Sequence, residues 1–328
     1  GSEERTYQAP LKGAQLSEGE HTITYYSVDK VNNREQTHEY SFYVDKTAPT
    51  VVEELMGNSY TASGREYYSG RNKLKLISMD NKAGVKEVRY SINQGSFKVY
   101  EKPFNLTQSG NLNIETLAID HVNNRKRTQK FTNQSSVSYV DLAGPELSHR
   151  FRGPSFVSKD TTFITPSTAI ILEGTDEESG FKKIEYASRN ENTLQAYQEP
   201  FSLDQEGLYN IRYVGYDNLD NTSSREFLCI VDHQGPEIFH RFSMISDKKR
   251  MIEGKEYPVF PEHVVLFLSA TDTYVGFDKM YYSVNGGPMK RYQSLIEGFE
   301  EETLYNLKVK AVDKLGNEQE GDIQFYID

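Results

Sequence analysis

The sequence predicts an all-β protein built from tandem β-sandwich repeats, and three observations support this prediction. One pattern recurs along the chain: a strand-like run ending in Asp, a turn rich in Asn, a second strand and a further Asp. Apolar and polar residues alternate in these runs, which is the period of a half-buried strand. No stretch of about ten residues carries the apolar period of a helix. A residue that recurs once per unit is expected to hold the unit together.

The two aspartates of the pattern mark the length of the repeat. The first Asp stands at Asp29, Asp120, Asp217 and Asp313. The second stands at Asp45, Asp141, Asp232 and Asp328. The unit therefore has about 95 residues, a length typical of one small sandwich with its own core.

The last two strands of each unit enclose the Asn-rich turn. The first strand begins with an apolar residue six positions before the first Asp, and its side chain is expected to face inward. These residues are Ile23, Ile114, Ile211 and Leu307. The second strand ends with an apolar residue directly before the second Asp, at Val44, Val140, Val231 and Ile327. Both strands are therefore expected to lie half buried.

Two further strands precede this pair in each complete unit. An Asp, a Gly four residues later and a strand containing Tyr recur as Asp80, Gly84 and Tyr90, as Asp176, Gly180 and Tyr186, and as Asp272, Gly276 and Tyr282. About seven short strands in about 95 residues are typical of an immunoglobulin-like sandwich. The chain has no Trp and a single Cys, Cys229, so tyrosines are expected to fill the core. Tyr209 resembles a tyrosine corner, and Tyr305 is equivalent.

The repeat divides the chain into four predicted segments. Residues 1–47 hold only the C-terminal strands of an immunoglobulin-like repeat, and residues 48–143, 144–234 and 235–328 hold one complete repeat each. We expect these units to form an elongated array. Because an isolated hairpin is marginal in water, the partial repeat is expected to pack on the next unit or to self-associate with another chain.

The links and turns of the repeat resemble a bacterial family. Residues 44–49 follow a Val-Asp-x-x-x-Pro pattern, and residues 313–317 follow an Asp-x-x-Gly-Asn pattern. The chain resembles bacterial immunoglobulin-like tandem repeats, and most closely the repeat named after a leptospiral outer-membrane protein. The resemblance implies a protein of the bacterial cell envelope, periplasmic or on the cell surface, or a secreted one, that serves as a spacer or an adhesion stalk. It implies no reaction.

Three groups of aspartates form the candidate metal sites. In an immunoglobulin-like unit, two of the Asp-containing loops lie at the end where the link from the previous unit arrives. The expected groups are Asp45 with Asp80 and Asp120, Asp141 with Asp176 and Asp217, and Asp232 with Asp272 and Asp313. Three carboxylates together suit calcium, and the resemblance implies stalks stiffened in this way. The other interpretation is that each Asp caps its own turn, which needs no metal.

Composition and missing motifs argue against several functions. The formal net charge is -11 without a basic stripe, so nucleic acid is not expected as a partner. No stretch approaches the ~20 apolar residues of a membrane helix, so this chain has no expected membrane span. It has no phosphate loop, nucleophile elbow or metal-type His spacing. The sequence therefore predicts no enzyme, and calcium is the only candidate cofactor.

The sequence is compatible with four functions. The first is a spacer or stalk, and the second is the binding of a protein or glycan, which the 23 tyrosines favour. The third is a subunit of a larger envelope assembly, and the fourth is an accessory carbohydrate-binding region of a secreted enzyme. Segments that do not fit the repeat are the candidate contact loops, namely residues 54–73, 189–196 and 243–263.

Overall fold

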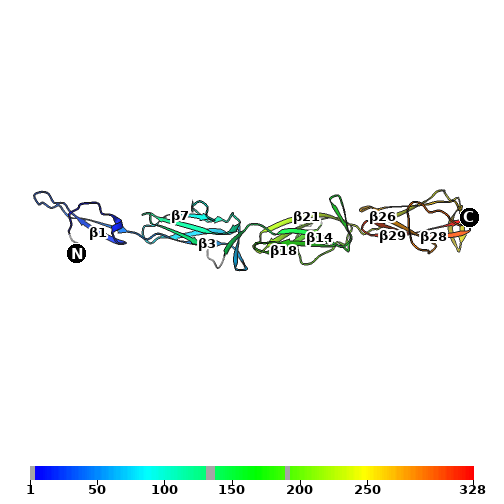
Figure 1. The fold of residues 1–328 in the computed structure, drawn as a ribbon, viewed down its shortest axis with the longest axis horizontal. Coiled ribbons are helices and arrows are strands. Elements are labelled where there is room, and N and C mark those ends of the chain that lie inside the picture. Colours follow the sequence, from blue (N-terminus) through cyan, green and yellow to red (C-terminus); the bar gives the residue numbers. More distant parts are fainter. Residues whose placement is uncertain (1–3, 131–136, 189–192) are drawn as a thin grey trace. The chain divides into compact units, whose positions relative to one another are not determined.

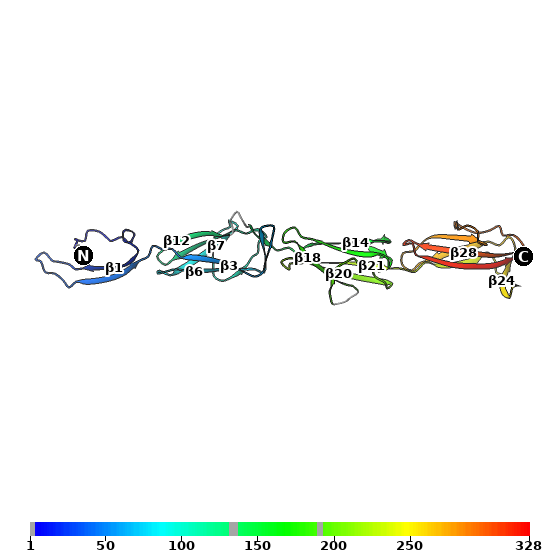
Figure 2. The same ribbon diagram turned by 90° about the horizontal axis from the view of Figure 1, so that it is seen from below.

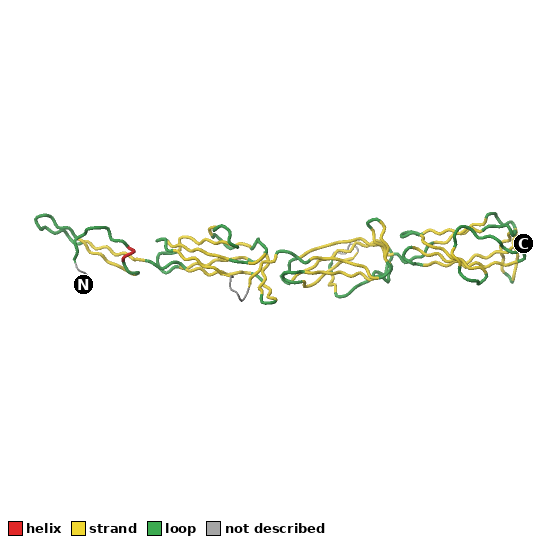
Figure 3. The backbone as a smooth tube through the Cα atoms, viewed as in Figure 1, coloured by secondary structure: helices red, strands yellow, loops and turns green. Residues whose placement is uncertain are grey.

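A computed structural model describes residues 4–130, 137–188 and 193–328. The chain divides into two compact units, Gly1–Ala143 and Gly144–Asp328, and each is described by itself. Strands dominate both units, and the only helical turn among the described residues is η1 (Gly13–Gln15) (Figure 3). No helix in the described part is long and apolar enough to cross a membrane. The all-β prediction is therefore confirmed.

The first unit begins with a hairpin that has no covering sheet. Strand β1 (Gly19–Tyr25) pairs antiparallel with β2 (His38–Val44) (Figure 1). Tyr25 is 55% exposed and Tyr40 is 64% exposed, and none of the described residues before residue 48 is fully buried. The hairpin thus lacks a core of its own, and its packing on another unit or another chain stays a prediction.

The rest of the first unit is one sandwich. Its sheets have the strand orders β3-β6-β9, β10-β13-β5-β4 and β12-β11-β7-β8. The strands are β3 (Thr50–Met56), β4 (Ser59–Ala62), β5 (Arg65–Ser69), β6 (Lys73–Met79), β7 (Val85–Ile92), β8 (Lys98–Val99), β9 (Phe104–Asn105), β10 (Gly110–Asn111), β11 (Ile114–Asp120), β12 (Arg125–Lys130) and β13 (Val137–Asp141).

The second unit contains two sandwiches. The first pairs β14 with β17 and forms a larger sheet of order β15-β16-β21-β20-β18-β19, and the second repeats this order with β22, β25 and β23-β24-β29-β28-β26-β27 (Figure 2). The first set is β14 (Glu146–Arg152), β15 (Ser155–Ser158), β16 (Thr161–Ile164), β17 (Ala169–Thr175), β18 (Phe181–Ser188), β19 (Gln195–Tyr197), β20 (Gly207–Asp217) and β21 (Thr222–Val231). The second is β22 (Glu237–Phe242), β23 (Lys248–Ile252), β24 (Lys255–Phe260), β25 (Leu266–Thr271), β26 (Phe277–Val284), β27 (Lys290–Arg291), β28 (Thr303–Asp313) and β29 (Glu318–Ile327).

An early hairpin closes each sandwich by a parallel strand pairing. The hairpins are β4–β5, β15–β16 and β23–β24. Their second strands lie parallel to the last strand of the same sandwich, β5 beside β13, β16 beside β21 and β24 beside β29. Residues 54–73 and 243–263 contain two of these hairpins, so they are not irregular insertions but belong to the repeat. Of residues 189–196, positions 189–192 lie outside the described residues.

Each sandwich has its own apolar core. Ile114, Ile211 and Leu307, which open the same strand in the three sandwiches, are 0% exposed. Each of them belongs to a separate hydrophobic cluster, as the period of two predicts. The hydroxyl of Tyr209 donates a hydrogen bond to the carbonyl of Gln205 (2.8 Å), which confirms the tyrosine corner in the second sandwich.

Candidate functional site

Each Asn-rich turn is held by the side chain of its first Asp. Asp120 Oδ1 accepts hydrogen bonds from the backbone N–H groups of Val122 (2.9 Å) and Asn124 (2.8 Å), and Asp120 Oδ2 accepts one from Asn124 Nδ2 (2.7 Å). Asp217 and Asp313 accept the same three bonds in their turns. The capping interpretation is therefore confirmed for these aspartates.

The backbone of this turn explains which residues fill it. The third residue after the Asp has a positive φ, at Asn32 (69°), Asn123 (70°), Asp220 (61°) and Gly316 (92°). Asn, Asp and Gly adopt this left-handed conformation more readily than other residues do. The Asn-Asn, Asp-Asn and Gly-Asn forms of the turn are therefore equivalent solutions to one backbone requirement.

The second aspartate of each group caps a different loop. Asp80 Oδ2 accepts the N–H of Gly84 (2.8 Å), and Asp176 Oδ1 accepts that of Gly180 (2.8 Å). Asp272 Oδ1 accepts three backbone N–H groups, including that of Gly276 (2.9 Å). The glycines have φ values of 76°, 88° and 81°, so the recurring Asp-to-Gly spacing serves a loop that turns through the left-handed region.

In two of the turns, the Asn that ends the turn also binds the incoming link. Asn124 Nδ2 donates to the backbone carbonyl of Asp45 (3.0 Å), and Asn317 Nδ2 donates to that of Asp232 (3.2 Å). The sequence pattern predicts the Asn-rich turn but not this contact between the turn and the link. The signal was an Asn four residues after each first Asp, at Asn33, Asn124, Asn221 and Asn317.

Two of the three predicted aspartate groups converge within a single unit. Asp45, Asp80 and Asp120 lie in the first unit, and each offers a carboxylate oxygen within 4.8 Å of the other two. Asp232, Asp272 and Asp313 do the same in the second unit. We call these sets the Asp45 cluster and the Asp232 cluster. Three carboxylates at this spacing form a donor set that suits a hard cation such as calcium.

The third predicted group is divided between the units. Asp176 and Asp217 both belong to the second unit, with carboxylate oxygens within 4.8 Å of each other. Asp141 belongs to the first unit, where it ends β13 and is 1% exposed. Its Oδ1 accepts the N–H of Ala143 (3.1 Å), so this Asp also caps the link that follows it.

Burial and charge repulsion act together on Asp232. Its side chain is 1% exposed. Burial, and then the carboxylate of Asp272, raise the pKa of Asp232 to about 6. The hydrogen bond that Asp232 accepts from the N–H of Gln234 acts in the opposite direction and lowers this pKa. Asp232 Oδ2 is buried and has no hydrogen-bond partner within the described part of the chain. An ionised carboxylate at this position is therefore unfavourable unless a cation compensates it.

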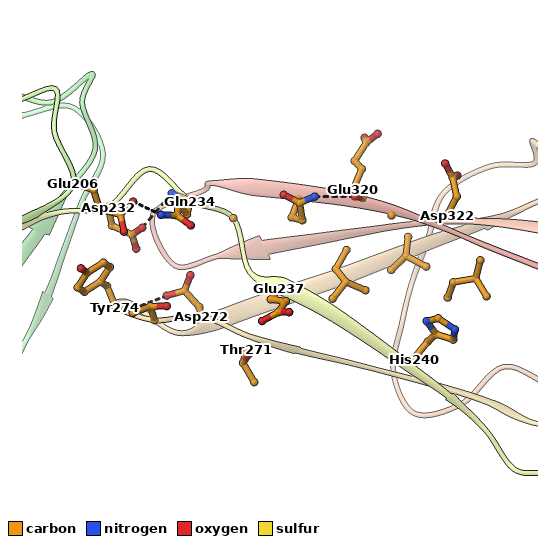
Figure 4. Close-up of a pocket in the computed structure, with 17 residues that line it drawn as sticks. Glu206, Asp232, Gln234, Glu237, His240, Thr271, Asp272, Tyr274, Glu320 and Asp322 are labelled. Carbon is orange, nitrogen blue, oxygen red and sulfur yellow. Dashed lines mark hydrogen bonds between the residues drawn. The ribbon is translucent and has the colours of Figure 1, made fainter.

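A solvent-accessible cavity of about 510 Å³ adjoins the Asp232 cluster. Figure 4 shows Asp232, Asp272 and Glu206 at one end of this cavity, with Gln234 of the link near them. Gln234 Nε2 donates to Glu206 Oε2 (2.6 Å). The lining is mainly polar and brings several acidic side chains together, an arrangement suited to a hydrated cation.

The single thiol lies away from this cavity. Cys229 is 0% exposed within the core of the second sandwich. Burial raises the pKa of the Cys229 thiol to about 12. At neutral pH the thiol therefore stays protonated, and Cys229 is a packing residue.

Comparisons with known proteins give weak likenesses only. No protein-family model matches the chain, and no curated protein matches it. A tetra-tandem repeat in the extending region of a large adhesion protein is 12% identical with a TM-score of 0.37, covering 96% of this chain and 83% of that chain. A 1.5-MDa bacterial ice-binding adhesin is 12% identical with a TM-score of 0.33, covering 87% and 99%. Protocadherin Gamma B7 extracellular cadherin domains 1–4 are 10% identical with a TM-score of 0.30, covering 96% and 94%. Likenesses at this level do not bear on function.

Proposed function

We propose that this chain is a non-catalytic structural or adhesive repeat segment of a bacterial cell-envelope or secreted protein. One observation carries the proposal: every complete sandwich is closed by a parallel pairing between an early strand and its last strand. A force that separates the two ends of a sandwich would load these paired strands in shear, so several hydrogen bonds would have to break together. Such a connection is suited to a protein that bears extension.

The use made of the recurring residues supports the same role. In the three complete sandwiches, the recurring apolar residues at the start of the first and the end of the second of the last two strands are buried in the cores. The recurring Asp and Asn residues hold turns and, in two cases, the incoming links. The recurring residues thus stabilise the sandwiches and attach them to their links. A catalytic role would instead require reactive groups gathered around a substrate position.

A partner-binding role is the second candidate, and the β1–β2 hairpin favours it. Its aromatic rings form stacked pairs, including Tyr25 with His38 (5.3 Å) and Tyr40 with Phe42 (6.0 Å). Tyr25, Tyr40 and Tyr43 are 55%, 64% and 43% exposed, and exposed aromatic residues are favoured at protein interfaces. A mass that rises with concentration in analytical ultracentrifugation would support self-association through this hairpin.

Single-molecule force spectroscopy tests the structural role. The full chain is held by its two ends and extended at constant speed. We expect three separate unfolding events, each releasing about 300 Å, because about 90 residues extend by about 3.3–3.6 Å each. Extension without discrete events would contradict a load-bearing function, since the sandwiches would then unfold at forces too low to matter.

A further inference from the structure

The geometry points to a calcium site at Asp232, Asp272 and Asp313, where the ion fastens the link after β21 to the loops of the last sandwich. The ion's role in bearing extension rests on the proposed function, but the site itself does not. Its ligands come from three separate segments: Asp232 directly follows β21, Asp272 follows β25, and Asp313 ends β28. One ion would therefore join the link to two loops.

One carboxylate oxygen of this cluster is buried and has no hydrogen-bond partner in the described protein. Asp232 is 1% exposed, and its Oδ2 has no hydrogen-bond partner there. Buried charges in proteins are paired or coordinate metals, because an uncompensated one is strongly unfavourable. Since the same side chain offers an oxygen within 4.8 Å of Asp272 and Asp313, its charge lies among other negative charges.

The Asp45 cluster provides an internal comparison. There the equivalent carboxylate is satisfied by the protein, because Asp45 Oδ2 accepts the N–H of Ala83 (2.9 Å). In the last sandwich the corresponding N–H, that of Val275, is donated to Asp272 Oδ1 instead (2.8 Å). Asp232 therefore retains an open acceptor where Asp45 does not, whereas in the Asp45 cluster the buried carboxylate oxygen without a partner in the described chain is Asp80 Oδ1. In the Asp232 cluster the open oxygen thus lies on the link itself, so a cation there would hold the link directly.

The number of protein carboxylates favours calcium over magnesium, because magnesium usually keeps several waters and is bound by only one or two carboxylates. Calcium binds oxygen at about 2.3–2.6 Å and accepts irregular geometry, so its ligands lie up to about 5 Å apart. Magnesium binds at about 2.0–2.1 Å and requires a near-ideal octahedron. The carboxylate oxygens here lie within 4.8 Å of one another. A carboxylate has about four lone-pair sites, so an Asp that caps a turn still has lone pairs that can bind a cation.

The same loops carry the apolar contact with the preceding sandwich. Phe163 in β16 packs in one buried cluster with Val275 and Leu315. Val275 lies three residues after Asp272, and Leu315 lies two residues after Asp313. An ion that orders these two loops therefore also orders the surface on which the preceding sandwich rests.

Calorimetric titration of the full chain with CaCl2, and separately with MgCl2, tests this site after removal of divalent ions. We compare the native chain with Asp232→Asn, and with Asp204→Asn as a control, because Asp204 is exposed and outside the clusters. Loss of one ligand charge is expected to weaken one calcium site by about a hundredfold in Asp232→Asn. The control is expected to bind as the native chain does.

Thermal melting is a second test, because the variant and the native chain are expected to exchange their order of melting temperature between chelator and calcium. In chelator, Asp232→Asn is expected to melt at a higher temperature than the native chain, because a buried and uncompensated carboxylate has been removed. In calcium the order is expected to reverse, because only the native chain gains the stability of the bound ion. Asp272→Asn serves as the second variant if Asp232→Asn does not fold.

Hydrogen exchange locates the effect and separates the two proposals. Calcium is expected to slow exchange in residues 232–236 and 271–276 of the native chain and not in those of Asp232→Asn. Equal exchange with and without calcium, or an unchanged number of calcium sites in Asp232→Asn, would overturn the site. Three unfolding events in force spectroscopy would still uphold the structural role in that case.

Discussion

Replacing Gly235 by Ala tests how closely the link must approach the last strand of the second unit. A Cβ at Gly235 would lie 2.3 Å from the carbonyl carbon of Glu318, 2.5 Å from its oxygen and 2.6 Å from the nitrogen of Gln319. These atoms belong to the backbone of β29, so they cannot move aside as a flexible side chain would. Ordinary contact requires about 3.4 Å or more, so the link or the strand must shift by about 1 Å.

The expected loss of stability follows from two opposing effects. Overpacking of this kind costs about 3 kcal/mol, and the smaller conformational freedom of Ala in the unfolded chain returns about 0.7 kcal/mol. The net loss of about 2 kcal/mol corresponds to a fall in melting temperature of about 4–8 °C for a unit of this size. Differential scanning calorimetry measures this shift, and hydrogen exchange should show faster exchange at the start of β29.

The matched control lies in the same strand. At Gly321 the nearest atom to an added Cβ is Ile238 Cδ1 at 3.8 Å, which is ordinary contact. Gly321→Ala is therefore expected to leave the melting temperature unchanged or to raise it slightly. Equal melting temperatures for Gly235→Ala and Gly321→Ala would refute the reasoning. Gly144 makes the equivalent close approach to the backbone of Thr222, so Gly144→Ala is expected to lower the melting temperature by the same amount as Gly235→Ala.

Three further predictions concern the second sandwich. Burial, and then Arg225, lower the pKa of His149, so the unfolded chain binds more protons and the contribution of His149 to stability should fall as the pH drops through about 6.5. Between pH 7.5 and 5.5 the melting temperature of the native chain should therefore fall relative to that of His149→Phe, which lacks this group but keeps the opposing contribution of Asp232. Ile211→Ala should cost about 3 kcal/mol in denaturant unfolding because Ile211 is 0% exposed. Its control is Leu208→Ala in the same strand, which should change stability by less than about 0.5 kcal/mol because Leu208 is 60% exposed. Iodoacetamide should leave Cys229 unmodified in the native chain at pH 8 and modify it after denaturation, and rapid native modification would contradict its burial.

The strand prediction succeeded because its signal is local. Alternating apolar residues mark one buried face of a strand, and the fully buried Ile114, Ile211 and Leu307 lie where that period placed them. The Asp-capped turns were also readable, since an Asp side chain binds backbone groups only a few residues away. The convergence of Asp45 with Asp80 and Asp120 followed from the loop arrangement of an immunoglobulin-like unit.

The early hairpins were missed because their place in the repeat depends on a distant strand. The turns at Ser63-Gly64 and Glu253-Gly254 have positive φ values, but the flanking strands vary in sequence among the repeats. What they share is the parallel pairing with β13 or β29, which joins residues far apart in the chain. Reading single segments therefore made two of these hairpins look like insertions.

The sequence by itself determined the repeat, the strand faces and the capped turns, because alternation and turn chemistry act over a few residues. The tertiary structure decided how each sandwich closes and which carboxylates meet. It also decided that Asp45 is satisfied by the N–H of Ala83, while Asp232 keeps an oxygen without a partner in the described chain. That difference arises from small changes in how a link meets a distant loop, and such contacts are fixed only when the whole sandwich has packed.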